Sequence, residues 1–174
     1  MVNQVSINPS VELFNRYECL IPTDDKETDV SVMQIKGNWV KITGTLDSGA
    51  AESVCPMDFM PMIPVSSPSD GRTYVAANGT KIKDQGAKQI AFTTAEGNER
   101  RIKFCRTSVM KPLMSSSKVE AAGNRIVLDG PSNSYIECKK SGQRTRIRQQ
   151  DGVYVIDMWI NTDNAGPVFG RQGR

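Results

Sequence analysis

The sequence predicts an all-β fold with one short helix, and three observations support this prediction. Between positions 29 and 160 many apolar residues alternate with polar ones, which is the period of a half-buried strand. Short turn signals, built from glycine, asparagine, aspartate and serine, separate these alternating runs. Serine caps, helix-forming residues and a terminal glycine occur together in one short stretch, 115–123, which predicts the helix.

The first predicted element is a β-hairpin. Residues 29–36 (DVSVMQIK) alternate polar and apolar side chains, Gly37-Asn38 is a turn signal, and residues 39–46 (WVKITGTL) form the second arm. Residues 57–71, rich in proline, serine and methionine, are predicted to form a loop.

A second hairpin is predicted over residues 73–94. Asn78-Gly79 stands between two strand-like arms there, and Asn-Gly is the strongest short-range hairpin signal. Five further strands are predicted at 99–110, 124–130, 134–140, 144–150 and 153–160.

The composition limits which functions are open to this chain. It has 174 residues with a net charge of +3, which does not by itself predict a nucleic-acid or membrane partner. No run approaches the length of a membrane span, and no secretory signal is visible. The absence of histidine excludes His-containing zinc sites, Ser-His-Asp triads and Cys-His dyads. Catalysis would therefore depend on carboxylates, on lysine, or on a hydroxyl activated by a group other than histidine.

The four cysteines are widely spaced and contain no Cys-x-x-Cys pair. We expect free thiols in a reducing compartment, and an intracellular, cytoplasmic location. A four-cysteine zinc site is formally possible but is not suggested by the spacing, so we expect neither a metal nor a cofactor. Cys55 is interpreted as a buried small hydrophobe rather than as a redox switch. The four positions are Cys19, Cys55, Cys105 and Cys138.

Residues 45–56 (TLDSGAAESVCP) carry the strongest chemical signal. Asp47 ends an apolar strand, and Ser48 and Gly49 follow at once, which fits either an ordinary turn or a turn that holds a catalytic acid. An aspartic peptidase needs two such carboxylates that share one proton. The other Asp-Gly sequences lack the intervening hydroxyl residue and are interpreted as turns, at Asp70, Asp129 and Asp151. One chain therefore supplies half a site, which a second copy would complete across a two-fold axis.

Four segments in order resemble the retropepsin-like aspartic proteases of retroelements, most closely the protease region of copia-type retrotransposon polyproteins. Residues 30–54 (VSVMQIKGNWVKITGTLDSGAAESV) resemble the strand pair that ends in the catalytic turn, and residues 74–86 (YVAANGTKIKDQG) resemble the flap. Residues 111–130 (KPLMSSSKVEAAGNRIVLDG) resemble the segment with the C-terminal helix, and residues 151–160 (DGVYVIDMWI) resemble a strand that follows in copia-type polyproteins. The resemblance covers about residues 29–160 and implies a retropepsin-like acid-protease barrel plus extra C-terminal strands.

This resemblance divides the chain into four parts. Residues 1–28 would be an N-terminal extension or connector, 29–130 the protease domain, 131–162 a C-terminal β extension, and 163–174 a flexible tail. Function would be that of an aspartic endopeptidase of a retroelement-type polyprotein, active as a homodimer on a peptide or polyprotein substrate bound as an added strand.

The resemblance also implies roles for individual residues. Asp47 would be the catalytic aspartate, one from each subunit, and Ser48 and Gly49 would build the turn and tie the two active loops together. The strand near 126–128 would help to form the dimer interface. The expected substrate-binding residues are Ala50 and Ala51 along the cleft and Ala77, Asn78 and Gly79 at the flap tip.

The sequence departs from the retropepsin pattern at Ser115. Retropepsins usually have glycine there, after two apolar residues, and serine carries a Cβ, so the backbone at this position must avoid angles that only glycine adopts. The alternative function is therefore a catalytically inactive, protease-like module for dimerisation or for binding peptide or nucleic acid.

The most basic stretch, residues 139–148, bears on that alternative. Strand alternation predicts that Arg144, Arg146 and Arg148 share one face, with Thr145 and Ile147 on the other. No aromatic residue is interleaved for base stacking, so we favour a solvated strand face over a nucleic-acid contact.

Overall fold

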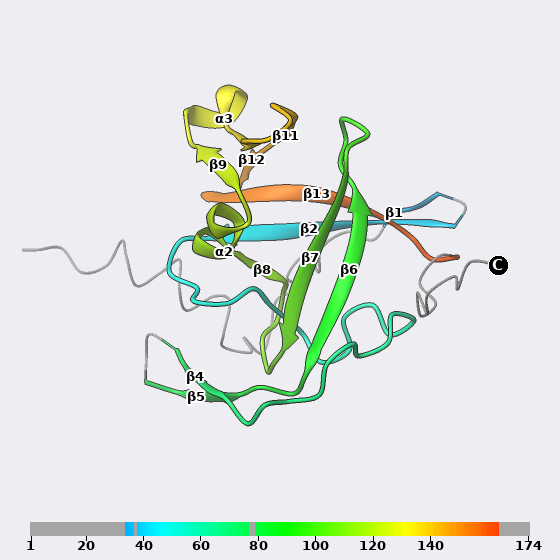
Figure 1. The fold of residues 1–174 in the computed structure, drawn as a ribbon, viewed down its shortest axis with the longest axis vertical. Helices are drawn as coiled ribbons and strands as arrows, with labels where there is room; N and C mark the ends of the chain where they lie inside the picture. The colour runs from blue at the N-terminus through cyan, green and yellow to red at the C-terminus, as the bar shows by residue number, and fades with distance from the viewer. Residues whose placement is uncertain (1–33, 37, 77–78, 164–174) are drawn as a thin grey trace, which may run out of the picture.

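The computed structural model describes residues 34–36, 38–76 and 79–163. The fold is mostly β, as predicted (Figure 1). The N-terminal extension, the start of the first predicted strand and the C-terminal tail lie outside the described residues. Among the described residues, no helix is long and apolar enough to cross a membrane.

Eight strands form the main sheet, in the order β1-β2-β8-β3-β7-β6-β13-β12. Strand β2 pairs with β8 on one side and with β13 on the other, and β13 also pairs with β6. Six strands therefore form a closed strand ring, namely β2, β8, β3, β7, β6 and β13. The bounds are β1 Gln34–Lys36, β2 Trp39–Asp47, β3 Val54–Cys55, β6 Ala87–Thr93, β7 Glu99–Arg106, β8 Leu113–Ser115, β12 Arg148–Gln150 and β13 Val153–Asn161.

The hydrophobic core follows from the alternation along the long strands. Strands β2 and β13 pair antiparallel over seven residue pairs, from Val155 opposite Thr45 to Asn161 opposite Trp39. Their inward residues meet those of β6 and β7, which cross them in Figure 1. Burying each such side chain stabilises the fold by about 1.5–3 kcal/mol. The most deeply buried members are Ile42, Ile90, Phe104, Ile156, Met158 and Ile160.

Two smaller sheets flank the ring. Strands β4 (Thr73–Val75) and β5 (Lys81–Lys83) form a hairpin, and β9 (Asn124–Val127), β10 (Tyr135–Cys138) and β11 (Arg144–Arg146) form a three-stranded sheet at the opposite end of the view (Figure 1). The predicted hairpin over 73–94 is too long, because its second arm ends at Lys83. Gly86, with a φ of +90°, lies between β5 and β6, which then pairs with β7.

Two short helices are present where the sequence predicted one. Helix α2 (Ser116–Ala121) lies inside the predicted range and has Ser115 as its N-cap. Helix α3 (Gly130–Asn133) was missed; it begins with Gly130-Pro131, and proline is favoured in the first helical turn. The Ser134 hydroxyl closes this turn, because it accepts from Asp129 N–H at 2.9 Å and donates to the Gly130 carbonyl at 2.6 Å.

The predicted strand 144–150 is broken at Ile147. This residue is fully buried, and the chain passes there from the three-stranded sheet to the main sheet. Arg148 consequently bonds twice to Asp157, while Arg144 and Arg146 stay exposed on β11. The prediction of one uninterrupted strand is therefore wrong, whereas its alternation is confirmed by the burial: Thr145 and Ile147 are buried, and Arg144 and Arg146 are exposed.

Candidate functional site

A cavity of about 440 Å³ lies beside the Asp47 turn. Four parts of the chain line it: the segment that follows β2, the hairpin β4–β5, the 107–109 segment after β7, and β8. Its apolar lining comes mainly from Val54, Val75, Ile82, Val109 and Leu113. The cavity can thus accept an extended chain with apolar side chains next to a carboxylate.

Asp47 is the last residue of β2, and its position is fixed from both sides. In the backbone, β2 runs parallel to β8, with Asp47 opposite Ser115. In the side chain, Oδ1 accepts a hydrogen bond of 2.7 Å from the Gly49 N–H. This bond closes a turn of the kind that aspartate forms with the backbone two residues on, and it sets the plane of the carboxylate.

The structure brings four of the eight predicted site residues to the cavity. Asp47, Gly49, Ala50 and Ala51 all line the cavity, whereas Ser48 is exposed beside it and is not part of the lining. Of the remaining predicted residues, Gly79 lies between β4 and β5 and is exposed, with a φ of +81°. Ala77 and Asn78 lie outside the described residues.

Hydrogen bonds close the hairpin turn that carries Gly79. Its N–H donates to the Ala76 carbonyl at 2.8 Å, and the Ala76 N–H donates to the Thr80 carbonyl at 2.9 Å. The hairpin presents Val75, which is 68% exposed, and Ile82 to the cavity. Single exposed apolar side chains are ordinary on a protein surface, so what distinguishes Val75 is its place in the cavity lining.

Sequence reasoning missed Glu52, the second carboxylate in the cavity lining. Its Oε1 lies 2.8 Å from Lys118 Nζ on α2 and 3.6 Å from Arg72 Nη1, just before β4. Glu52 therefore links the segment after Asp47 to the helix and to the base of the hairpin. Each cation is more than half exposed, so we expect each ion pair to contribute under about 1 kcal/mol.

Tyr74 on β4 was also missed. It lines the cavity, and its pKa is raised above the usual value by burial and by a hydrogen bond with the Cys105 side chain. Tyr74 is therefore an uncharged phenol in the cavity wall. The signal available in the sequence was weak, since Tyr74 and Cys105 are 31 positions apart.

Ser115, where the sequence departs from the retropepsin pattern, has φ −65° and ψ 119°. This is ordinary extended backbone, so the expectation that the chain avoids glycine-only angles here is confirmed. The side chain is fully buried, and its Oγ donates to the Ala50 carbonyl at 2.6 Å.

The described cysteines are all free thiols, as expected. Cys55 and Cys105 are buried and Cys138 is half-buried. Burial raises the pKa of Cys55 to about 12, which agrees with the interpretation of Cys55 as a core residue. Within the described ranges, no cluster of three histidine, cysteine or acidic side chains could hold a metal ion.

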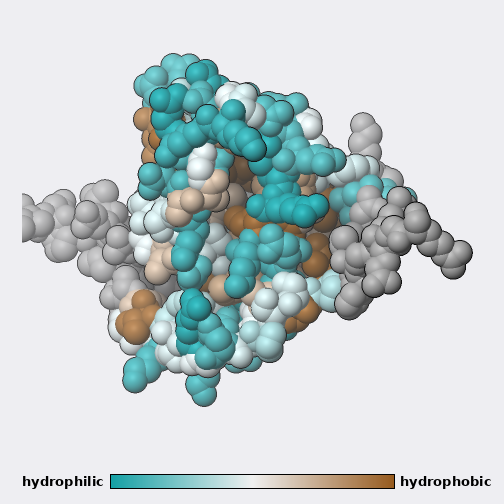
Figure 2. All heavy atoms as spheres, in the orientation of Figure 1, coloured by the Kyte–Doolittle hydropathy of each residue, from teal (hydrophilic) through white to brown (hydrophobic). Residues whose placement is uncertain are grey.

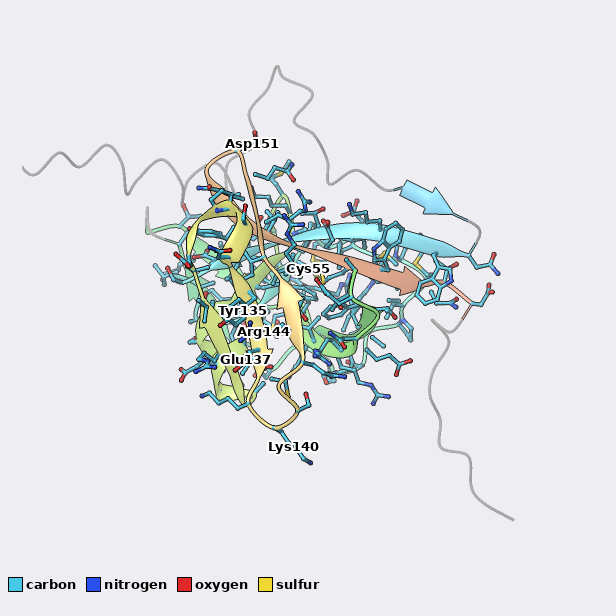
Figure 3. The ribbon with its side chains drawn as sticks, turned by 90° about the horizontal axis from the view of Figure 1, so that it is seen from above. Cys55, Tyr135, Glu137, Lys140, Arg144 and Asp151 are labelled. Atoms are coloured by element: carbon cyan, nitrogen blue, oxygen red, sulfur yellow. The ribbon has the colours of Figure 1, made fainter. Side chains whose placement is uncertain are left out.

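The basic stretch forms contacts inside the three-stranded sheet. The Arg144 guanidinium lies 4.1 Å from the centre of the Tyr135 ring, and its Nε donates to Glu137 at 2.9 Å (Figure 3). Arg125 also bonds to Glu137, and Lys140 points away at the tip of the loop (Figure 3). The surface over this sheet and α3 is largely hydrophilic (Figure 2). An aromatic residue therefore does lie beside the arginines, brought there by strand pairing rather than by proximity in sequence.

The assembled site consists of one oriented carboxylate, an apolar cavity and a hairpin with an exposed apolar side chain at its edge. Such a carboxylate can act as a general acid or base if a second one shares its proton. Comparison of the chain with protein-family models, with curated proteins and with solved structures found no match.

Proposed function

We propose that this chain is an aspartic endopeptidase of a retroelement-type polyprotein, active as a homodimer in which each copy supplies Asp47. The observation that carries the proposal is the position of the Asp47 carboxylate. It is held by the Gly49 N–H at 2.7 Å and faces an apolar cavity bounded by the hairpin β4–β5. The retropepsin-like barrel expected from the sequence is part of the same proposal, and the closed strand ring is consistent with it.

A second copy is needed because one chain offers one usable acid. Among the described residues that line the cavity, the only other carboxylate is Glu52, and Lys118 and Arg72 already pair with it. The Glu52 carboxylate is therefore already engaged in ion pairs within its own chain. The partner's Asp47, brought close by a two-fold axis, would supply the second acid, and the pair would titrate as a unit.

The proposed chemistry uses the two carboxyl groups in turn. The ionised one takes a proton from water as the water oxygen bonds to the peptide carbonyl carbon, and the protonated one donates its proton to the carbonyl oxygen. The tetrahedral diol then breaks down: the first carboxyl gives its proton to the peptide nitrogen, the C–N bond breaks, and the second takes back a hydroxyl proton. The products are a carboxylic acid and an amine, and the starting protonation state is restored.

Substrate would bind as an extended strand between the Asp47 turn and the hairpin. The small side chains of Ala50, Ala51 and Ala76 leave room for a peptide backbone to approach the cavity lining. Backbone hydrogen bonds would give affinity, and the apolar wall formed by Val54, Val109 and other residues would accept alternate side chains.

The test is digestion of a mixed peptide library from about pH 4 to about pH 7 by the native chain at several concentrations. Asp47→Asn is the decisive variant, and Asp129→Asn, at an exposed aspartate that directly precedes Gly130, is the matched control. We expect the native chain and Asp129→Asn to cleave peptides and Asp47→Asn not to cleave them. The rate of cleavage should rise faster than linearly with protein concentration.

Two outcomes would contradict the proposal. Equal cleavage by native chain and Asp47→Asn would assign the activity to another site. No cleavage by a native chain shown to be a folded dimer would favour the inactive, protease-like binding module.

A further inference from the structure

We propose that Ser115 is a positioning residue for the Asp47 loop, holding it against the start of helix α2 through its hydroxyl group. This inference rests on the proposed function, because it concerns the geometry of that same site. It assigns a role to the residue at which the sequence departs from the glycine of the retropepsin pattern. Where the retropepsin pattern has a conformationally free glycine, this chain would have a serine whose hydroxyl forms a specific hydrogen bond to the Asp47 loop.

The hydroxyl of Ser115 uses all of its hydrogen-bonding capacity. Its Oγ lies 2.6 Å from the Ala50 carbonyl oxygen, 2.9 Å from Ser117 Oγ and 3.3 Å from the Lys118 amide nitrogen. A carbonyl oxygen only accepts and an amide N–H only donates, so the Ser115 hydroxyl must donate to Ala50 and accept from the other two. The direction of every bond is thus determined.

Helix capping alone does not account for this arrangement. A cap needs only the bond from the Lys118 N–H, which at 3.3 Å is the longest of the three. The shortest bond, at 2.6 Å, goes to Ala50, three residues after Asp47. The distances therefore indicate that the Ser115 hydroxyl binds the Asp47 loop more closely than it caps helix α2.

A second bond runs between the same two segments. The Ser115 N–H donates to Ser53 Oγ at 3.0 Å, and both serines are buried. The Asp47 loop is therefore held at Ala50 and again at Ser53, on either side of Glu52, whose carboxylate lies 2.8 Å from Lys118 Nζ. Three contacts tie residues 50–53 to residues 115–118.

These contacts continue the strand pairing where it would otherwise stop. Strands β2 and β8 pair in parallel for only three residues, and the last pair is Asp47 with Ser115. Beyond it the chain turns at Ser48 and Gly49, which are exposed and have no core packing to hold them. The bond from Ser115 to Ala50 fixes the far side of this turn, and so limits movement of the Asp47 carboxylate. A shift of about 1 Å in a catalytic group can cost about a hundredfold in rate.

The experiment compares Ser115→Ala, which removes the hydroxyl, with Ser115→Thr, which keeps it, in the full chain. Ser117→Ala is the matched control, because it removes a neighbouring hydroxyl that contacts Ser115 but not the loop. We expect Ser115→Ala to lower kcat by about tenfold to a hundredfold with little change in KM. Ser117→Ala and Ser115→Thr should stay within about threefold of the native kcat.

Ser115→Gly restores the residue usual in retropepsins. If Ser115 is only a tolerated substitute for glycine, this variant will keep native activity and overturn the inference. If the hydroxyl positions the loop, Ser115→Gly will lose kcat as Ser115→Ala does. A loss of activity that matches the loss of folded protein, measured by urea unfolding, would also overturn it.

A readout independent of catalysis keeps the two proposals separable. Hydrogen exchange of the Gly49 amide, which donates to Asp47, should be at least about tenfold faster in Ser115→Ala, with amides of β13 unchanged. If the native chain does not cleave peptides but this exchange difference is found, the proposed function fails and the role of Ser115 in fixing the loop stands. Unchanged exchange at Gly49 would refute that role, whether or not the chain is active.

Discussion

Asp157 is the residue whose substitution should reveal most about what holds the strand ring together. It lies on β13, and its carboxylate accepts from Arg148 Nε at 2.8 Å and Arg148 Nη2 at 2.7 Å. Lys41 Nζ on β2 is 3.2 Å away, and the Thr43 hydroxyl donates at 3.2 Å. One carboxylate thus joins β12, β13 and β2.

Asp157→Asn should destabilise the protein by about 2 kcal/mol at pH 7. Removing one partner of a buried ion pair costs about 3–5 kcal/mol, and exposed pairs contribute about 0–1 kcal/mol. The Asp157 side chain is 14% exposed, but Arg148 is 35% and Lys41 25% exposed, so solvent screening places this network between the two limits.

The effect should depend on pH in a defined direction. Burial alone would raise the pKa of Asp157, but the bonds from Arg148 and Lys41 together outweigh it and hold the pKa below 3.8. A group whose pKa is lowered by folding adds stability above its unfolded pKa, near 3.9, and loses it as the pH falls through the folded value. The difference between native chain and variant should therefore be largest near neutral pH and shrink below about pH 4.

The assay is urea unfolding followed by tryptophan fluorescence at pH 7 and at about pH 3, with Glu99→Gln as control. Glu99 is an exposed carboxylate on β7 that forms no ion pair within the described part of the chain, and we expect no measurable change from it. A loss of stability in Asp157→Asn that is the same at both pH values would refute the electrostatic reasoning, because a steric defect does not titrate.

Two further predictions concern the cysteines and the glycine turns. Hydrogen bonding with Ser141 lowers the pKa of Cys138 to about 7, so at pH 7 iodoacetamide should alkylate Cys138 at least about tenfold faster than the buried Cys55, as measured by peptide mapping; comparable rates would contradict this. Gly86→Ala should cost about 2–3 kcal/mol in urea unfolding, because a Cβ there would lie 2.7 Å from a backbone oxygen at a φ of +90°. Gly97→Ala, with a φ of +81° and open space around it, should cost about 1 kcal/mol, and equal losses would show that the close contact is unimportant.

The elements that sequence reasoning identified are those whose signals are local. Alternation over residues 39–46 and 153–160 predicted β2 and β13 nearly to their ends. A serine cap and a terminal glycine predicted α2. In each case the pattern that identifies the element lies within the element itself, because side-chain burial follows from the backbone period.

Pairing between distant segments could not be predicted in the same way. Closure of the strand ring depends on β13 meeting both β2 and β6, more than 60 residues away in sequence. The break at Ile147 has the same origin, since a run of alternating residues does not show that its two halves join different sheets. Asp157, the partner of Arg148, is only nine positions away, and the pairing of β12 with β13 brings the two side chains together.

The same distinction between local and distant signals applies to the residues of the candidate site. The motif predicted Asp47 and the residues just after it, because a carboxylate followed by serine and glycine is a local turn signal. The opposite cavity wall, with Val109 and Leu113, comes from about 60 positions further along the chain and has no local signal. Nor does a lone glutamate such as Glu52 show in sequence which cations will meet it.

Asp47 and Glu52, the two carboxylates in the cavity lining, have different environments, and the difference bears on the proposed chemistry. Glu52 lies between Lys118 and Arg72, and its ion pairs with them make it a structural link. Asp47 is oriented by a neutral N–H donor and forms no ion pair among the described residues, so its carboxylate is not engaged by a cation of its own chain. In the proposed dimer the second acid therefore comes from the partner's Asp47 rather than from Glu52, because the ion pairs of Glu52 tie it to α2 and to the base of the hairpin of its own chain.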